Sequence, residues 1–243
     1  MDFMTVWEEG LLNQFFKANT VSETAGLVMT VSAIVLCMVI SYFIGSVNFS
    51  IIVSRNYYHD DIRLHGSGNA GATNIMRTYG KKMAILTFAG DFLKAVVASL
   101  IGRLVFFGYH GAILAGLFCF LGHIFPCYFK FRGGKGVVTA AAMILMVGPW
   151  WIFASLLLLF AVIVVATKYV SLGSVICLMV YPILLDRAGL KGFSVLAAFV
   201  LATVCVFAHR ENIKRIMNGE ERKISFKVKD RKPDTEEEHK DER

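Results

Sequence analysis

The sequence predicts an all-α fold: a polytopic membrane helix bundle of about seven transmembrane helices, with the N-terminus outside and the C-terminus in the cytoplasm. Hydrophobic residues make up 56% of the 243 residues and charged residues only 18%, whereas soluble domains have about 45–50% and about 25%. The apolar residues gather in long runs, and the basic residues gather in the loops between alternate runs. These three observations indicate an integral membrane protein.

Each apolar run is a candidate membrane span, because roughly 17–25 helical residues cross the hydrocarbon core of a bilayer. The fourth run is short, and Gly148 and Pro149 divide it from the fifth. It forms either a short tilted helix or one half of a bent hairpin. The seven candidate spans are 26–53, 83–107, 111–129, 137–148, 150–167, 170–186 and 192–208.

The basic residues orient this bundle. With seven crossings, 20 of the 25 Lys and Arg residues fall on one side, in 54–82, in 130–136, at Lys168 and from His209 onward. Basic loops favour the cytoplasmic side of a membrane. The distribution therefore predicts a cytoplasmic C-terminus.

The chain divides into three regions. Residues 1–24 form an N-terminal extension in which Trp7, Phe15 and Phe16 favour an interfacial helix. Residues 25–222 form the seven-helix membrane domain. Residues 223–243 form a charged tail, poor in apolar residues, which predicts disorder. Its basic start either contacts anionic lipid headgroups or is solvated.

The composition also argues against several classes of site. The five cysteines are scattered through or beside the spans without C-x-x-C spacing, which predicts free thiols rather than disulfides or zinc ligands. No cluster of His, Asp or Glu suggests a metal site, so we expect metal-independent chemistry and no cofactor. The net charge of +7 is explained by membrane topology, so nucleic acid is not an expected partner.

The first polar loop is "HGSGNAGATNIMR", from His65 to Arg77. Its three glycines permit backbone angles that are closed to other residues, and successive N–H groups can then converge on an anion. Thr73 or Asn74 is expected to cap a helix that starts near Ile75, with its positive end at the same place. The closing arginine offers a forked cation for phosphate oxygens. The alternative is a flexible turn. The candidate residues are Gly66, Ser67, Gly68, Asn69, Gly71, Thr73, Asn74 and Arg77.

The second polar loop is "KFRGGKG", in which Gly133, Gly134 and Gly136 surround Lys135. The glycines offer backbone donors and the lysine a point charge. The loop lacks the leading glycine and the Ser or Thr of a Walker A motif, so nucleotide hydrolysis is not indicated. The alternative is a plain basic cluster that only sets the topology.

The third polar segment is "HRENIKR", at the end of the last span. If the helix continues, His209 and Asn212 share one face. An imidazole has an unperturbed pKa close to neutrality. His209 is therefore a candidate base, with a headgroup anchor as the alternative.

Ionisable residues also lie inside the spans. Asp91 and Lys94 are one helical turn apart in the second span, where charges are costly unless they are paired or face a polar cavity. We expect an internal ion pair that locks the bundle, with a role in lining the site as the alternative. His123 and Pro126 are expected to shape the approach to the lysine loop, with His123 in a structural role.

Three long segments resemble one family. "DIRLHGSGNAGATNIMRTYGKK" with Asp91–Lys94 after it, then "GHIFPCYFKFRGGKGVVT", then "HRENIKR" are similar to the signature regions of the PlsY family of bacterial acyl-phosphate:glycerol-3-phosphate acyltransferases. The resemblance runs from about Gly45 to Arg222. One departure is Asn48, where members of the family often have proline. We expect it to alter the bend of the first span rather than the chemistry.

The resemblance implies a fold and a reaction. It implies a seven-helix bundle in the bacterial cell membrane with a cytoplasmic active site. The reaction is transfer of a fatty acyl group from acyl phosphate to the sn-1 hydroxyl of glycerol 3-phosphate, which gives lysophosphatidic acid and inorganic phosphate. Acyl-CoA is not the direct donor, so an upstream enzyme that forms acyl phosphate is an implied partner.

The resemblance also implies the roles of the site residues. The catalytic and glycerol-3-phosphate-binding residues would be Ser67, Arg77, Lys135, His209 and Asn212. The acyl phosphate would bind the glycine-rich loops, at Gly66, Gly68, Asn69, Gly71, Thr73, Asn74, Gly133, Gly134 and Gly136.

Three other functions remain as alternatives. A scaffold or assembly protein of the membrane would leave the loop of Gly, Asn and Arg residues unexplained. A membrane transporter of a small phosphorylated solute would carry its site near the bilayer midplane between repeated halves, whereas the polar residues here gather at one end and no internal repeat is visible. A lipid-phosphate hydrolase would release phosphate without an acceptor. The sequence does not predict the acyl-chain preference or the oligomeric state.

Overall fold

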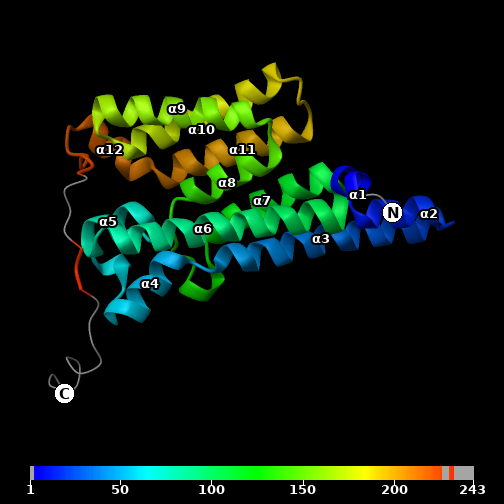
Figure 1. Cartoon of the computed structure of the whole chain (residues 1–243), viewed down its shortest axis with the longest axis horizontal. Helices are drawn as coiled ribbons and strands as arrows, with labels where there is room; N and C mark the ends of the chain where they lie inside the picture. Colours follow the sequence, from blue (N-terminus) through cyan, green and yellow to red (C-terminus); the bar gives the residue numbers. More distant parts are fainter. Residues whose placement is uncertain (1–2, 226–229, 233–243) are drawn as a thin grey trace.

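The computed structural model describes residues 3–225 and 230–232, and every regular element in these ranges is helical (Figure 1). The elements are α1 Phe3–Glu9, α2 Leu11–Ala18, α3 Glu23–Ser46, α4 Phe49–Tyr58, η1 Ile62–Leu64, α5 Ala72–Tyr79, α6 Lys81–Ile101, the π-helical η2 Gly102–Phe107, α7 Gly108–Ile124, η3 Cys127–Phe129, α8 Val137–Val147, α9 Trp150–Thr167, α10 Val170–Arg187, α11 Phe193–Ala208 and α12 Arg210–Met217.

Each predicted span contains one apolar helix: α3, α6, α7, α8, α9, α10 or α11. In the described ranges, four helical segments are long and apolar enough to cross a membrane by themselves, and the bent pair α11–α12 makes a fifth if it counts as one span. The helix α8 is apolar but shorter, and Gly148 and Pro149 separate it from α9. The all-helical membrane fold is confirmed, whereas seven crossings and their orientation stay predictions.

The first predicted span, 26–53, is broken at Asn48, where a change in its bend was expected. The helix α3 ends at Ser46, and α4 begins at Phe49. The break contains Asn48, whose side-chain oxygen accepts a hydrogen bond of 3.1 Å from the Ile51 N–H and so caps α4. Its amide nitrogen donates to the Ala70 carbonyl at 3.4 Å. Asn48 therefore joins the broken span to the first polar loop.

The helices form two layers (Figure 1). One layer contains α9, α10, α11 and α12, and the other contains α3, α4, α5 and α6. The helices α7 and α8 join the layers, since α7 packs on both α3 and α11 and α8 packs on α6 and α9. Small residues allow the closest contact: a Cβ atom added to Gly45 of α3 would lie 2.1 Å from the Cys119 carbonyl oxygen of α7.

An ionic network holds α3, α6 and α7 together. The Lys94 ammonium lies 2.8 Å from an Asp91 carboxylate oxygen and 3.0 Å from His123 Nδ1. It also donates to the carbonyls of Gly45, at 2.9 Å, and Val47, at the end of α3. All three side chains are buried. The predicted internal ion pair is confirmed, and it fixes the backbone at the break beside the polar loop.

The N-terminal extension forms α1 and α2, which pack on η2. The Arg103 guanidinium lies 4.2 Å from the centre of a Trp7 ring and donates to the Trp7 carbonyl at 3.1 Å. A second donor of the same side chain reaches the Met146 carbonyl at 3.0 Å. The helices are therefore bound to the bundle, and their position at a membrane interface stays a prediction.

Part of the charged tail contacts the bundle. The Ile224 N–H donates to the Lys168 carbonyl at 2.8 Å, and the Arg231 N–H donates to the Tyr79 carbonyl at 3.1 Å. These backbones find acceptors on both layers, and the disorder expected for 223–243 as a whole stays a prediction. Residues 226–229 and 233–243 lie outside the described residues.

Candidate active site

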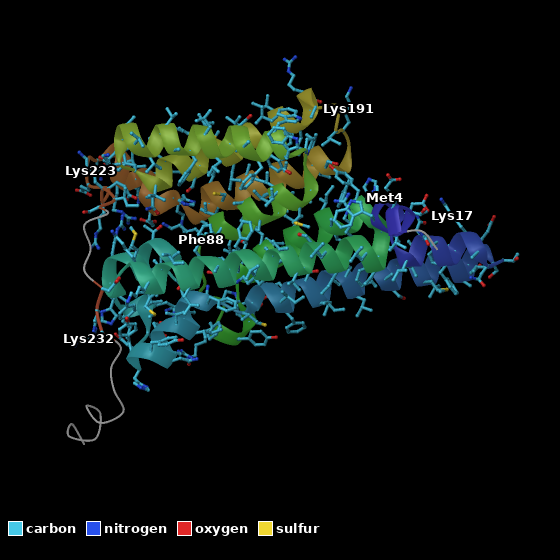
Figure 2. The ribbon with its side chains drawn as sticks, viewed as in Figure 1. Met4, Lys17, Phe88, Lys191, Lys223 and Lys232 are labelled. Atoms are coloured by element: carbon cyan, nitrogen blue, oxygen red, sulfur yellow. The ribbon has the colours of Figure 1, made fainter. Side chains whose placement is uncertain are left out.

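A cavity of about 490 Å³ lies between the two layers. Its polar end contains all five predicted catalytic residues, which come from the first loop, α5, the second loop, the α11–α12 junction and α12: Ser67, Arg77, Lys135, His209 and Asn212. Its apolar wall comes from α6, α8, α9 and α10 and includes Phe88, Phe92, Val138, Ala141, Ile144, Phe153, Leu157, Phe160 and Leu178. Phe88 projects from α6 toward the layer of α9 and α10 (Figure 2).

Asn74 folds the first polar loop. Its side-chain oxygen accepts from the Ser67 N–H at 3.0 Å, and its nitrogen donates to the carbonyls of Ile62, His65 and Asn69 at 2.9–3.2 Å. The expected cap by Thr73 or Asn74 is wrong, because α5 begins earlier, at Ala72, with Gly71 as its N-cap and no side-chain capping bond. Asn74 instead forms hydrogen bonds within the first polar loop.

The first loop gives most of its predicted residues to the cavity wall. Gly66, Ser67, Asn69, Gly71, Thr73, Asn74 and Arg77 line it. Gly68 does not, because it turns the chain at φ 70° and its N–H donates to the His65 carbonyl at 2.9 Å. The first N–H groups of a helix have no acceptor within it. The Asn74 N–H donates to the Gly71 carbonyl at 2.9 Å, which leaves the N–H groups of Ala72 and Thr73 in the cavity wall to bind an anion.

The second loop gives only Lys135 and Gly136 to the cavity. Gly133 and Gly134 were expected to offer backbone donors to a phosphate, but their N–H groups donate to the carbonyls of Ile124, at 3.1 Å, and His123, at 3.2 Å. A Cβ atom on Gly134 would lie 2.2 Å from His123 Nε2 and 2.5 Å from the Ala70 oxygen. These two glycines bind the lysine loop closely to α7 and to the first loop.

A chain of hydrogen bonds connects the second loop with α12. The Lys135 ammonium donates to the Asn212 side-chain oxygen. The Asn212 nitrogen donates to Glu221 at 2.6 Å, and the Arg215 guanidinium donates to the other Glu221 oxygen at 2.9 Å. Ser171 of α10 donates to the same carboxylate at 2.7 Å. The glutamate therefore organises the cationic end of the cavity.

Burial sets the protonation of the cavity residues. Burial lowers the pKa of Lys135 to about 8, with Arg215 and Arg77 acting in the same direction and Glu221 against it. Burial, helped by the Lys135 charge, lowers the pKa of His209 to about 4. His209 is therefore neutral at pH 7, and Nδ1 donates to the Cys205 carbonyl at 2.9 Å because a carbonyl only accepts. Its Nε2 is left as an acceptor.

Several cavity residues were missed by the sequence reasoning, among them Ser171, Ser174, Arg215, Glu221 and Arg222. Arg215 stands in the "HRENIKR" segment, so its positive charge could have marked it as a candidate phosphate-binding residue. Glu221 follows α12 in a charged stretch, where nothing distinguishes it from its solvated neighbours. Among the described residues, no group of three or more His, Cys, Asp or Glu side chains could hold a metal ion.

Comparison with known proteins identifies the family. A family model described as glycerol-3-phosphate acyltransferase matches residues 35–219. The glycerol-3-phosphate acyltransferase of Finegoldia magna is 40% identical over 195 residues, which cover 79% of this chain and 96% of that protein. The enzyme of Clostridioides difficile is 41% identical over 207 residues, which cover 82% and 99%.

Solved structures give the same result. The crystal structure of PlsY (YgiH), an integral membrane glycerol 3-phosphate acyltransferase, in its glycerol 3-phosphate form has a TM-score of 0.74 and 34% identity, and the match covers 79% of this chain and 96% of that one. The lysophosphatidic acid form has a TM-score of 0.70 and 32% identity over the same shares. The chain belongs to the glycerol-3-phosphate acyltransferase family.

Proposed function

We propose that this protein transfers a fatty acyl group from acyl phosphate to the sn-1 hydroxyl of glycerol 3-phosphate. The hydroxyl oxygen forms a bond to the acyl carbonyl carbon, and the bond from that carbon to the phosphate oxygen breaks. The products are lysophosphatidic acid and inorganic phosphate, and the hydroxyl proton leaves on the phosphate. The relatives crystallised in glycerol 3-phosphate and lysophosphatidic acid forms support this acceptor and this product.

One observation carries the proposal: a cluster of cations stands at one end of a cavity whose other walls are mainly apolar. Arg77, Lys135 and Arg215 line the polar end, and side chains of α6, α8 and α9 line the rest. Both substrates carry a phosphate, and the donor also carries a long apolar chain. The apolar walls therefore offer the acyl chain a path between the helices. The cationic end offers a binding place to both phosphates.

The loops give the two phosphates different partners. The first turn of α5 and the Arg77 guanidinium offer N–H donors on one side of the cavity, and Lys135 with Asn212 offers donors on the other. Holding hydroxyl and carbonyl together can supply about 7–11 kcal/mol of the barrier. Donors aimed at the developing oxyanion add to this by stabilising its charge.

His209 then positions the acceptor rather than taking the proton. A base with a pKa of about 4 is a poor proton acceptor at pH 7, whereas the departing phosphate gains charge as the bond breaks. The Nε2 atom of the neutral imidazole can accept a hydrogen bond from the attacking hydroxyl. Because acyl phosphate is already activated, no covalent enzyme intermediate is required.

The site is proposed to face the cytoplasm of a bacterial cell, within the inner or plasma membrane. The basic loops support this orientation by the positive-inside rule. Glycerol 3-phosphate then arrives from water and the acyl chain through the lipid. A reaction that forms acyl phosphate must precede this one.

The test supplies purified protein with palmitoyl phosphate and glycerol 3-phosphate, without added metal. We expect lysophosphatidic acid and phosphate to appear together, and no product when palmitoyl-CoA replaces palmitoyl phosphate. Phosphate without acylated glycerol would indicate hydrolysis. Equal rates with palmitoyl-CoA would contradict the donor, and no product from folded protein would contradict the activity and favour a transporter.

A further inference from the structure

The described residues beyond the family match contact both layers of the molecule. The match ends at residue 219. Lys223 then lies beside the layer of α9–α12, whereas Lys232 lies beside α4 and α5 of the other layer (Figure 2). The described segments 220–225 and 230–232 therefore lie beside different layers.

The first segment forms part of the cavity wall. Glu221 and Arg222 line the cavity. The Arg222 carbonyl accepts a hydrogen bond of 3.1 Å from Arg77 of α5, in the opposite layer. The Ile224 N–H donates to the Lys168 carbonyl at 2.8 Å, which holds the segment beside α9 and α10.

The second segment, 230–232, packs on the junction of α5 and α6. The Asp230 carboxylate accepts from the Lys81 N–H at 2.6 Å and the Lys82 N–H at 3.3 Å, so it satisfies two donors in the first turn of α6. Gly80, with φ 101°, makes room for it, because a Cβ atom there would lie 2.4 Å from the carboxylate oxygen.

Arg231 adds backbone and ring contacts at the same junction. Its N–H donates to the Tyr79 carbonyl at 3.1 Å, and its carbonyl accepts from the Tyr58 hydroxyl at 3.0 Å. Its guanidinium lies 5.5 Å from the Tyr58 ring centre and 5.8 Å from that of Tyr79. The two rings are stacked 4.0 Å apart. The contacts thus span α4 and α5.

This junction is directly connected to the phosphate end of the cavity. Tyr79 ends α5, the helix that carries Arg77. The Tyr79 hydroxyl donates to Asp60 at 3.0 Å, and the same Asp60 oxygen lies 2.7 Å from His65 Nε2, at the start of the glycine-rich loop. The position of Tyr79 therefore affects the position of the helix that carries Arg77.

We propose that Asp230 and Arg231 form a latch, a pair of positioning residues that hold α5 and Arg77 in the geometry that binds glycerol 3-phosphate. This proposal rests on the proposed function, which supplies glycerol 3-phosphate as the ligand. It touches no reacting atom, and it acts on the phosphate end rather than on the apolar wall. Its loss therefore weakens acceptor binding and leaves the donor and the chemical step unaffected.

The test compares four variants of the full-length protein: Asp230→Ala, Asp230→Asn, Tyr58→Phe and Lys232→Ala. Asp230→Asn keeps an oxygen acceptor for α6 and is the conservative rescue. Lys232→Ala is the matched control, because the Lys232 side chain has no hydrogen bond or ion pair to a described residue. Calorimetry measures the Kd for glycerol 3-phosphate, kinetics measures KM and kcat, and thermal unfolding measures stability.

We expect Asp230→Ala and Tyr58→Phe to raise the Kd and KM for glycerol 3-phosphate by about 3–10-fold, the effect of losing one or two hydrogen bonds. The KM for palmitoyl phosphate, kcat and Tm stay as in the wild type, and so do all values for Asp230→Asn and Lys232→Ala. An unchanged Kd in Asp230→Ala would overturn the latch, as would a joint fall of kcat and Tm. Wild-type protein that does not bind glycerol 3-phosphate would overturn the proposed function itself.

Discussion

Lys135 and Asn212, 77 positions apart in the sequence, are joined by a hydrogen bond from the lysine ammonium to the asparagine oxygen. The bond connects the loop before α8 with α12 across the polar end of the cavity. It gives Lys135 one neutral partner and leaves its other N–H donors for an anion. The proposed chemistry depends on this arrangement.

Removing either cation of the site should abolish transfer. We expect each variant to lower kcat/KM by about 10²–10³-fold, because Lys135→Ala removes a donor to developing charge and Arg77→Ala removes the forked cation proposed to bind the phosphate of glycerol 3-phosphate. Circular dichroism and thermal unfolding should still report a folded bundle. Lys130→Ala is the control, because Lys130 is an exposed lysine of the same loop and should keep wild-type activity. Wild-type turnover in both site variants would refute the assignment of the site.

Activity should fall as the pH rises through about 8. Lys135 is charged below its pKa of about 8 and neutral above it, so the protonated form that binds phosphate is lost on the alkaline side. The second ionisation of a phosphate monoester lies near pH 6, so the substrate phosphate is almost fully ionised where this fall occurs. The measurement is kcat/KM for glycerol 3-phosphate between pH 6 and 10.

Lys135→Arg is the matched variant for this profile, because a guanidinium stays charged throughout. Its activity is expected to be lower, with the alkaline fall moved to higher pH. A wild-type profile that stays flat to pH 10 would show that the lysine charge is not required.

Breaking the buried ion pair should destabilise the bundle. Asp91→Asn leaves the Lys94 ammonium in the interior without its carboxylate, which costs about 3–5 kcal/mol. The double variant Asp91→Asn/Lys94→Met removes both charges and should recover part of this loss. Thermal unfolding in detergent measures both effects. Asp186→Asn, at an exposed position near the end of α10, should change stability by no more than about 0.5 kcal/mol. Equal unfolding temperatures for Asp91→Asn and wild type would contradict the structural role.

A methyl group at Gly134 should displace the lysine loop. Its Cβ would overlap His123 and the Ala70 carbonyl, so one of the two loops must move. We expect Gly134→Ala to raise the KM for glycerol 3-phosphate and lower kcat while the helices remain folded. Gly26→Ala, where a Cβ would meet no atom within 4 Å, should behave as the wild type. If both variants had the same kinetics, close packing of these loops would not matter for catalysis.

The helices could be predicted because each apolar run had the length and hydropathy of one element. A changed bend at Asn48 could be predicted, but a complete break could not, because it depends on Lys94, which binds the Val47 carbonyl from another helix. Gly148 and Pro149 did mark a boundary, since proline favours the start of a helix and disfavours its interior.

The site could be predicted as a set of residues but not as a set of contacts. Ser67, Arg77, Lys135, His209 and Asn212 do line one cavity, as their positions in three polar segments implied. The sequence could not show that the Gly133 and Gly134 N–H groups donate to carbonyls at the end of α7. It also could not show that the Asn74 side chain forms its hydrogen bonds within its own loop. These depend on the relative positions of elements far apart in the sequence.

The contacts of the tail could not be predicted from its composition. Low hydrophobicity and high charge usually predict disorder, and they describe 223–243 correctly as a composition. The contacts of Asp230 and Arg231 use backbone groups at the start of α6 and the end of α5. A count of residue types does not show where such backbone acceptors and donors lie.

The most direct measurement is phosphate release by purified protein from palmitoyl phosphate, with and without glycerol 3-phosphate, for the wild type and Lys135→Ala. We predict that the wild type releases phosphate only when glycerol 3-phosphate is present, in a one-to-one ratio with lysophosphatidic acid, and that Lys135→Ala releases almost none. Release by the wild type at the same rate without the acceptor, or by Lys135→Ala at the wild-type rate, would contradict acyl transfer at this site.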